Sequence, residues 1–301
     1  MRRLTAILLA CTWIGTVPLM AADQTPANPQ DQLAMTALEG LMSAPADRAL
    51  PLLQKVLNGN RSTEVKRRAL FVLSQFEEPQ AQTLLLESAR NGNPELRQEA
   101  IRSIGIGGRD DTLAALSEIY RGGDEAIREA VLEAWMISDR EQEIFEVAMN
   151  ASSSEEAERA IQLLGVMDAR ESLQRLQQAG KGSTGLVQAF AIADDLDSLK
   201  AMANDASDPA VQIEAVQAIG IIDNDSARVA LQQIYRDTRS AEVREAALQG
   251  MLIADDEAGV LKLYQGSNDP AEKQQLLRTL TMIGGDAALE AIDAALEGRS
   301  P

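Results

Sequence analysis

The sequence predicts an all-α protein built as a right-handed α-solenoid, or superhelix, of about eight to nine helix hairpins. Aromatic residues make up 3% of the 301 residues and hydrophobic residues 45%, so aliphatic and alanine side chains must form the core. That composition favours closely packed helices over sheets. In addition, helix-capping residues recur about every 30 residues, and one segment is repeated further along the chain.

The best-formed unit is residues 93–120, NPELRQEAIRSIGIGGRDDTLAALSEIY. Asn93 can cap a helix through its side-chain oxygen, and Pro94 suits the first helical position. A glycine-rich stretch is expected to end this helix by adopting the left-handed conformation, at Gly105, Gly107 and Gly108. A second amphipathic helix follows. Neither helix of such a hairpin can bury its apolar face alone, so the unit needs neighbours.

The same pattern recurs along the chain. The predicted caps are Ser62, Asn93, Asp124, Ser153, Ser183, Asp208, Ser240 and Asp269, at intervals of 31, 31, 29, 30, 25, 32 and 29 residues. An apolar anchor stands three residues after most caps, whereas Glu156 and Glu272 replace it in two repeats. A shorter helix is expected before each capped one, for example at 114–121 and 229–236. A gap-free shift of 115 residues aligns 93–121 with 208–236, and 12 of 29 positions are identical.

Four aromatic residues are assigned to the scaffold. The three tyrosines, Tyr120, Tyr235 and Tyr264, each end the first helix of a hairpin. This shared position predicts a buried ring with its hydroxyl in water at the turn. Trp135 lies on the apolar side of its helix and is expected in the core.

The N-terminus reads as a targeting segment. Residues 1–22 are interpreted as a signal peptide, because Arg2 and Arg3 precede an apolar stretch that ends in two alanines. The alternative is a lipoprotein signal that anchors the chain through Cys11. We expect a flexible mature N-terminus at 23–32, a solenoid at 33–301 whose first helix spans about 33–42, and a periplasmic or otherwise exported location. No other segment reaches the ~20 apolar residues of a membrane span.

Composition argues against catalysis, metals and cofactors. The chain has no histidine, and Cys11 is its one cysteine, so Ser-His and Cys-His nucleophile pairs and the usual zinc ligands are missing after cleavage. The net charge of −18, or −20 without the leader, argues against nucleic acid as a partner. The acidic clusters at 194–197 and 223–225 lack the frame of a calcium loop and are interpreted as turn caps.

The repeats resemble those of HEAT-repeat proteins, in the short form of about 30 residues found in phycobilisome bilin lyases. The resemblance is carried by NPELRQEAIRSIG at Asn93, DPAVQIEAVQAIG at Asp208 and SAEVREAALQGML at Ser240, and it covers roughly residues 46–298. It implies an α-solenoid whose second helices line the concave surface. It implies little about function.

Two sets of recurrent positions are candidates for a role. A basic residue follows the anchor in five repeats and is expected to form a structural ladder by bonding turn carbonyls or an aspartate of an adjacent repeat: Lys66, Arg97, Arg128, Arg244 and Lys273. The positions five and nine residues after each cap would face the concave side. They form either a solvated charged face or a binding surface, and comprise Arg67, Phe71, Gln98, Arg102, Glu129, Glu133, Glu158, Gln162, Gln188, Ile192, Ile213, Gln217, Glu245, Gln249, Gln274 and Arg278.

The sequence therefore predicts an exported, non-catalytic scaffold or adaptor that binds another protein or a peptide through the concave face. A basic partner would suit the net charge. The alternative is a lyase-like enzyme or chaperone similar to the bilin-lyase proteins with such repeats. A third hypothesis is a purely structural, lipid-anchored module.

Overall fold

A computed structural model describes residues 28–204, 208–222 and 224–297, and at residues 183 and 184 it describes the backbone alone. These residues contain 18 helices and no strand, as an all-α solenoid requires. The predicted signal peptide, Cys11 and most of the predicted flexible N-terminus lie outside the described residues. The helices are α1 (Pro29–Leu41), α2 (Ala46–Asn58), α3 (Thr63–Leu73), α4 (Pro79–Asn91), α5 (Pro94–Gly107), α6 (Asp110–Gly122), α7 (Glu125–Ile137), α8 (Glu141–Asn150), α9 (Ser154–Val166), α10 (Arg170–Gln178), α11 (Ser183–Ile192), α12 (Leu196–Asn204), α13 (Pro209–Ile219), α14 (Asp225–Asp237), α15 (Ala241–Ile253), α16 (Glu257–Gly266), α17 (Pro270–Ile283) and α18 (Asp286–Leu296).

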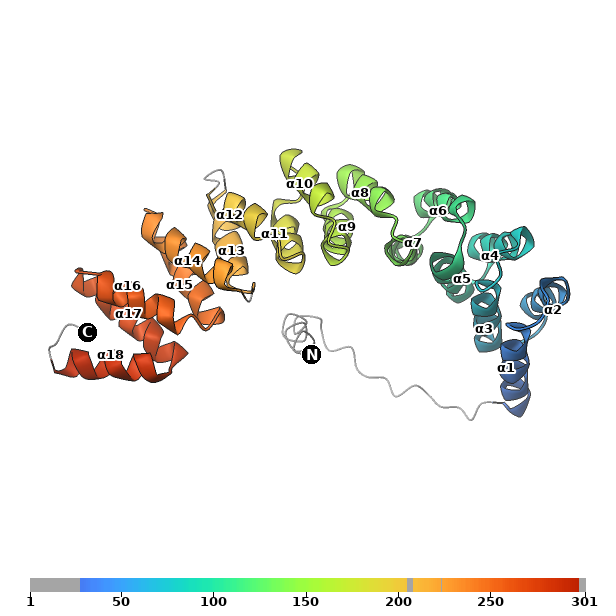
Figure 1. Ribbon diagram of the computed structural model, residues 1–301. Helices are drawn as coiled ribbons and strands as arrows, with labels where there is room; N and C mark the ends of the chain where they lie inside the picture. Colours follow the sequence, from blue (N-terminus) through green and yellow to red (C-terminus); the bar gives the residue numbers. More distant parts are fainter. Residues whose placement is uncertain (1–27, 205–207, 223, 298–301) are drawn as a thin grey trace. The chain divides into compact units, whose positions relative to one another are not determined.

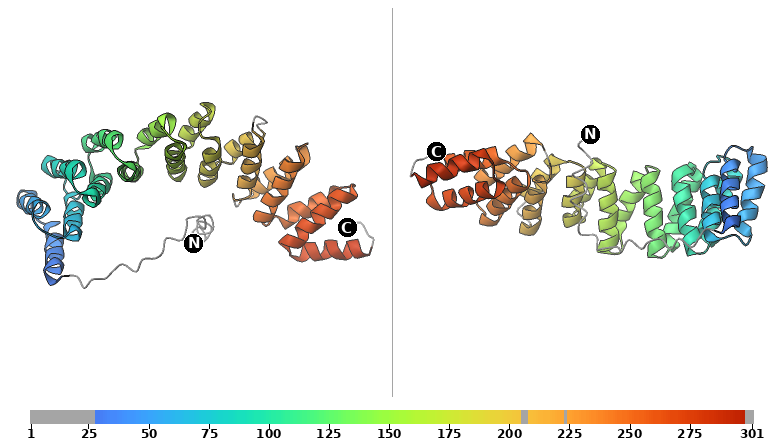
Figure 2. Two further views of the ribbon diagram at one scale, coloured as in Figure 1. Left: turned by 180° about the vertical axis from the view of Figure 1, so that it is seen from behind. Right: turned by 90° about the horizontal axis from the view of Figure 1, so that it is seen from below.

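The chain divides into two units, residues 1–127 and 128–301, and the boundary falls inside α7. In the first unit, α3 packs on α1 and α5, and α4 packs on α2 and α6. In the second, α9, α11, α13, α15 and α17 pack in sequence, α10 packs on α8, and α16 packs on α14 and α18. Each unit therefore has an odd-helix layer and an even-helix layer, an alternation that can be followed in Figures 1 and 2.

Most helices of the odd layer begin where the caps predict. Side-chain oxygens accept a first-turn amide at Ser62, Asn93, Asp124, Ser153, Asp208, Ser240 and Asp269. The prediction for Ser183 was wrong, because α11 begins at that residue and follows Gly182 at φ 62°. A glycine at this point needs no side-chain cap to turn the chain.

Three helices begin earlier in the structure than the sequence predicted. The first helix begins at Pro29 rather than near residue 33, because Asn28 caps it and accepts the amide of Gln30 at 3.1 Å. α6 and α14 each span 13 residues and begin about one turn before the predicted 114 and 229. Their first turns are polar, so the apolar pattern alone could not reveal them; Asn224, for example, caps α14.

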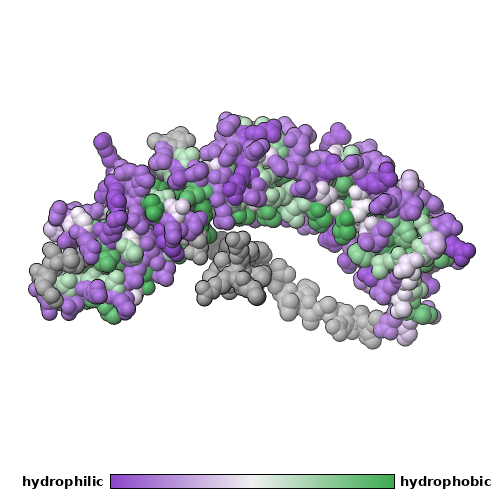
Figure 3. Space-filling model, viewed as in Figure 1, coloured by the Kyte–Doolittle hydropathy of each residue, from purple (hydrophilic) through white to green (hydrophobic). Residues whose placement is uncertain are grey.

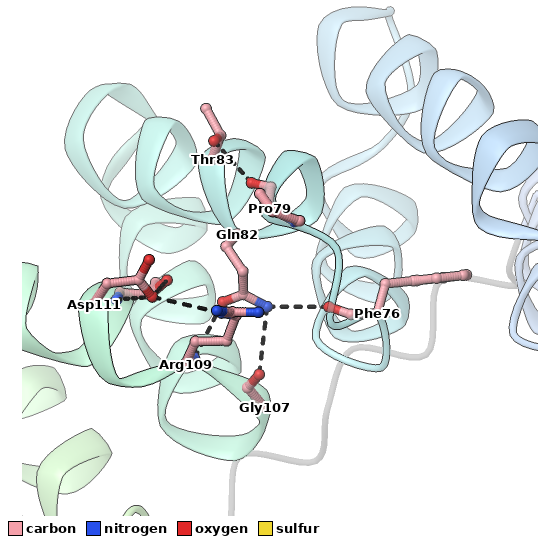
Figure 4. Close-up of polar contacts among 8 residues, drawn as sticks. Phe76, Pro79, Gln82, Thr83, Gly107, Arg109 and Asp111 are labelled. Carbon is pink, nitrogen blue, oxygen red and sulfur yellow. Dashed lines mark hydrogen bonds and ion pairs between the residues drawn. The ribbon is translucent and has the colours of Figure 1, made fainter.

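The glycine-rich turn after α5 works differently from the prediction. None of its glycines has a positive φ. Gly107 instead permits a close approach between repeats, since a Cβ atom at this position would lie 1.9 Å from the carbonyl oxygen of Ser74. Gln82 of α4 joins the same two turns: its Nε2 donates to the carbonyls of Phe76 at 3.0 Å and Gly107 at 3.4 Å, and its Oε1 accepts the amide of Arg109 (Figure 4).

In two later repeats a glutamine also bonds to the turn of the next repeat, but its partner there is an aspartate carboxylate. Gln174 and Gln232, on α10 and α14, donate to the carboxylates of Asp195 and Asp256 in the next repeat, at 3.2 and 2.9 Å. Both aspartates are buried, and each accepts an amide of the helix that follows it. The cluster at 194–197 therefore contains a structural cap, in line with its interpretation from the sequence.

The tyrosines occupy one structural position, as predicted. Tyr120, Tyr235 and Tyr264 are buried near the ends of α6, α14 and α16. The expected solvated hydroxyl is wrong for Tyr235, which donates to Glu272 Oε1 at 3.0 Å. Glu272 stands where most repeats have an apolar anchor, and it also accepts a hydrogen bond from the hydroxyl of Ser267. Its carboxylate therefore has two hydrogen-bond donors, Tyr235 and Ser267.

Burial, together with the hydrogen bond to Glu272, raises the pKa of Tyr235 well above its usual range. A raised pKa stabilises the fold below about pH 10, the unfolded value, and this contribution is lost as the pH rises further. We expect the stability advantage of the native chain over Tyr235→Phe to shrink between pH 9 and 11, by at most ~1.4 kcal/mol for each pH unit above 10. Urea unfolding at each pH measures it. An advantage that stays constant across this range would contradict the assignment, and Glu272→Gln should reduce the pH dependence.

Candidate functional site: the exposed face of the odd-numbered helices

The predicted ladder residues contact the scaffold in several ways. Arg97 Nε donates to the carbonyl of Ala89 at 3.1 Å, and Arg244 Nη2 donates to the carbonyl of Thr238 at 3.2 Å. Two of them lie over tyrosine rings of the even layer, Arg244 over Tyr235 at 5.6 Å and Lys273 over Tyr264 at 5.4 Å. Lys66 is half-buried.

Arg128 reaches the next repeat, but its partner is a glutamate rather than the expected aspartate. Its Nη1 lies 3.6 Å from Glu156 Oε1, and the glutamate side chain is 15% exposed. Glu156 occupies an anchor position that is apolar in most repeats. A buried carboxylate at this point requires a cation or hydrogen-bond donors, and Arg128 supplies one.

The predicted binding residues are all exposed or half-buried, so none contributes to the core. Several, however, bridge neighbouring helices of the odd layer. Arg67 of α3 donates to the carboxylate of Glu99 of α5 at 3.2 Å. The same carboxylate also accepts a hydrogen bond from Arg102 at 3.4 Å. In the second unit, Glu129 accepts Arg159 Nε at 2.7 Å and Glu245 accepts Gln275.

Another bridge joins Gln188 of α11 to Glu214 of α13. Partial burial raises the pKa of Glu214, while the hydrogen bond from Gln188 acts in the opposite direction. In the other three bridges the residue five positions after one cap meets the residue six positions after the next. Since exposed ion pairs contribute ~0–1 kcal/mol each, these bridges orient the surface more than they stabilise it.

An amide row follows in the second unit, formed by Gln162, Gln188, Gln217 and Gln249. Gln217 Nε2 of α13 donates to Gln249 Oε1 of α15 at 2.7 Å. Gln188 belongs to this row because α11 is shorter than its neighbours. The pattern counted from Ser183 had placed Ile192 beside the glutamines, whereas the structure puts Ile192 at the C-terminal end of α11.

One further turn along each helix lies a row of exposed aliphatic residues, of which the sequence prediction included only Ile192. The aliphatic row of the second unit is Ile137, Val166, Ile192, Ile221, Ile253 and Met282, at or beside the C-terminal ends of α7, α9, α11, α13, α15 and α17. These side chains are 48–63% exposed. Figure 3 shows hydrophobic surface on the side of this unit where α9 and α11 lie. The sequence contained a signal for this row, because its members continue the four-residue spacing of the two rows of predicted binding residues.

An exposed aspartate accompanies four members of the aliphatic row. Asp139, Asp168, Asp194 and Asp255 each stand two residues after a row member, with φ between 51° and 58°. Each occupies the left-handed position of a Schellman motif, in which the next amide bonds back five residues, as Asp256 N does to Met251 O at 2.9 Å. Four of the six row members are therefore followed closely by an exposed carboxylate.

The described residues show neither a metal site nor a membrane-spanning helix. In the part of the chain that the structure describes, no three potential metal ligands gather in one place. None of the described helices is long and apolar enough to cross a membrane. The arrangement suits contact with another polypeptide: hydrogen-bonding amides between carboxylates and aliphatic side chains.

The comparison with protein-family models agrees with this architecture over part of the chain. A family model of HEAT repeats matches residues 49–136. No curated protein matches the sequence. Among solved structures, human deoxyhypusine hydroxylase in complex with glycerol is 16% identical over 75% of this chain and 99% of its own, with a TM-score of 0.33. A computationally designed self-assembling cyclic homo-oligomer is 15% identical over 89% of this chain and 99% of its own, with a TM-score of 0.14. Residues 49–136 therefore contain HEAT repeats, and the helices that follow continue the same all-α repeat architecture.

Proposed function

We propose that this chain is an exported, non-catalytic scaffold or adaptor that binds another protein or a peptide through the odd-helix layer of its second unit. HEAT repeats support protein interaction in general terms. The observation that carries the proposal is the aliphatic row, in which six consecutive odd-numbered helices each expose one large apolar side chain. Contiguous exposed apolar surface bordered by polar residues is typical of protein interaction sites.

Export and the absence of catalysis rest on the sequence. The apolar leader after Arg2 and Arg3 supports export, and its removal would leave a chain without cysteine or histidine. Such a chain has neither a thiolate nucleophile nor a histidine base, which favours a role carried by its surface. Mass spectrometry of the secreted chain should give an N-terminus at Asp23; an acylated Cys11 would instead establish the lipid-anchored alternative.

Site-specific crosslinking in intact cells of the source organism tests the binding face. A photoreactive amino acid placed at Gln217, in the amide row, is expected to capture one reproducible protein, identified by mass spectrometry. The control is Val229 on α14 of the even layer, which is 60% exposed and therefore more accessible than the half-buried Gln217. Equal capture from Val229, or capture from Val229 alone, would refute the proposed face.

A charge reversal sharpens the same test. Glu158 of α9 is exposed, and it is a better choice than Glu129, whose reversal would also break the bridge to Arg159. We expect Glu158→Lys to reduce capture at Gln217 without lowering the free energy of unfolding. Unchanged capture would exclude Glu158 from the interface.

A further inference from the structure

We propose that the partner presents a cationic amphipathic helix to the aliphatic row, so that its aliphatic residues contact Ile192, Ile221 and Ile253 and its lysines or arginines contact the neighbouring aspartates. This inference rests on the proposed function and specifies the chemistry of the partner. It depends on three observations: the charge of the second unit, the placement of the aspartates, and the spacing of the row.

The negative charge of the protein is concentrated in the unit that carries the row. Residues 128–301 contain 31 acidic and 15 basic residues, a net charge of −16, whereas residues 1–127 contain 15 acidic and 13 basic residues, a net charge of −2. A field of this sign attracts cationic segments and repels acidic ones. An aliphatic surface within it therefore favours a partner that is both apolar and basic.

The aspartates put this charge directly beside the apolar contacts. Asp139, Asp194 and Asp255 are exposed and lie at left-handed positions next to row members. The turn itself does not require a carboxylate, because glycine or asparagine adopts this conformation at least as readily. Nor do these side chains cap the following helices: α8 has no side-chain cap, and α16 is capped by Asp256. The caps therefore do not require these charges, and each carboxylate can also face a cation of a partner.

The spacing of the row fits a helix. Packed helices lie about 8–10 Å apart, so adjacent row members repeat at roughly that distance. In an α-helix, residues seven apart lie on one face with a rise of about 10.5 Å. A helix of about 15 residues therefore presents three heptad positions, enough to contact α11, α13 and α15 together.

The test uses the chain without its leader and a synthetic peptide of about 15 residues with leucines at heptad spacing and lysines beside them. Titration calorimetry should detect binding that weakens as NaCl rises from about 0.05 to 0.5 M. A peptide with glutamate in place of each lysine, and one of the same composition with the heptad pattern scrambled, should bind at least about tenfold more weakly.

One double and one triple variant assign the contacts. Asp194→Asn and Asp255→Asn together keep side chains that tolerate the left-handed turn, and should weaken binding and reduce its salt dependence. Ile192→Gln, Ile221→Gln and Ile253→Gln together should weaken binding by about tenfold or more at every salt concentration. Val229→Gln and Asp237→Asn on α14 are matched even-layer controls and should change neither.

Three results would overturn the proposal: equal binding of the scrambled or the anionic peptide, equal weakening by the α14 controls, or self-association of the chain that the isoleucine variants abolish. The last would identify the row as a contact between copies. If crosslinking at Gln217 captures a partner while the cationic peptide fails to bind, the partner chemistry is wrong and the proposed function stands. If both fail, the binding face itself is wrong.

Discussion

Replacing Phe190 by alanine is expected to lower the free energy of unfolding by about 3–5 kcal/mol. Phe190 is completely buried in α11, which packs between α9 and α13 of the odd layer. Removing the ring forfeits its transfer free energy and leaves a cavity that neighbouring helices can only partly fill. Because each repeat contacts only its neighbours, the loss should be felt at both interfaces of α11. Urea unfolding followed by circular dichroism measures it.

The matched control is Phe71→Ala. Phe71 of α3 is half-buried, and the guanidinium of Arg68 lies over its ring at 5.0 Å. The same chemical change should therefore cost less than half as much, because part of the ring is already in water. Equal losses at the two positions would mean that the burial of Phe190 does not determine its contribution.

The second large effect is expected at Asp256, where alanine should cost about 2–4 kcal/mol. The Asp256 carboxylate is buried and accepts the amide of Gly259 at 2.9 Å and Gln232 Nε2 at 2.9 Å. Its loss removes the cap of α16 and leaves the half-buried amide of Gln232 without this acceptor. Thermal and urea unfolding should both report the loss, and a double-mutant cycle with Gln232→Ala measures the coupling between the two side chains.

Asp255 provides the control in the adjacent position. Its side chain is exposed at φ 52°, and Asp255→Asn should change stability by no more than about 0.5 kcal/mol. Two neighbouring aspartates thus have separate expected roles, one in the junction between repeats and one on the surface. A large loss of stability from Asp255→Asn would contradict this division and weaken the proposed role of the row carboxylates.

The proposed interaction surface and the scaffold share the same helices, so the charge changes that test binding must be chosen with care. Glu129 and Glu245 lie on the exposed face, yet each bridges to a neighbouring helix of the odd layer. Reversing them would alter the orientation of two repeats as well as the charge. Glu158 and the exposed aspartates of the row are better probes of binding.

Much of the architecture was accessible from local sequence. Asn93 followed by Pro94, and six equivalent caps, mark where odd-layer helices begin, because capping depends on residues within one turn. The identity between residues 93–121 and 208–236 likewise predicted a repeated hairpin, and the buried tyrosines followed from their shared position. Amphipathic spacing also separated the core of each helix from the candidate binding face.

Contacts between repeats required the tertiary structure, because they join residues about 30 positions apart whose relative register is set by packing. Gly107 is needed for its approach to Ser74, not for a left-handed turn, and α11 begins without the predicted cap. The register of α11 in turn decided that Ile192 belongs with Ile221 and Ile253 rather than with the glutamines. The sequence by itself determined an all-α repeat and its exposed face; only packing decided which exposed residues are tied to the scaffold and which form the aliphatic row.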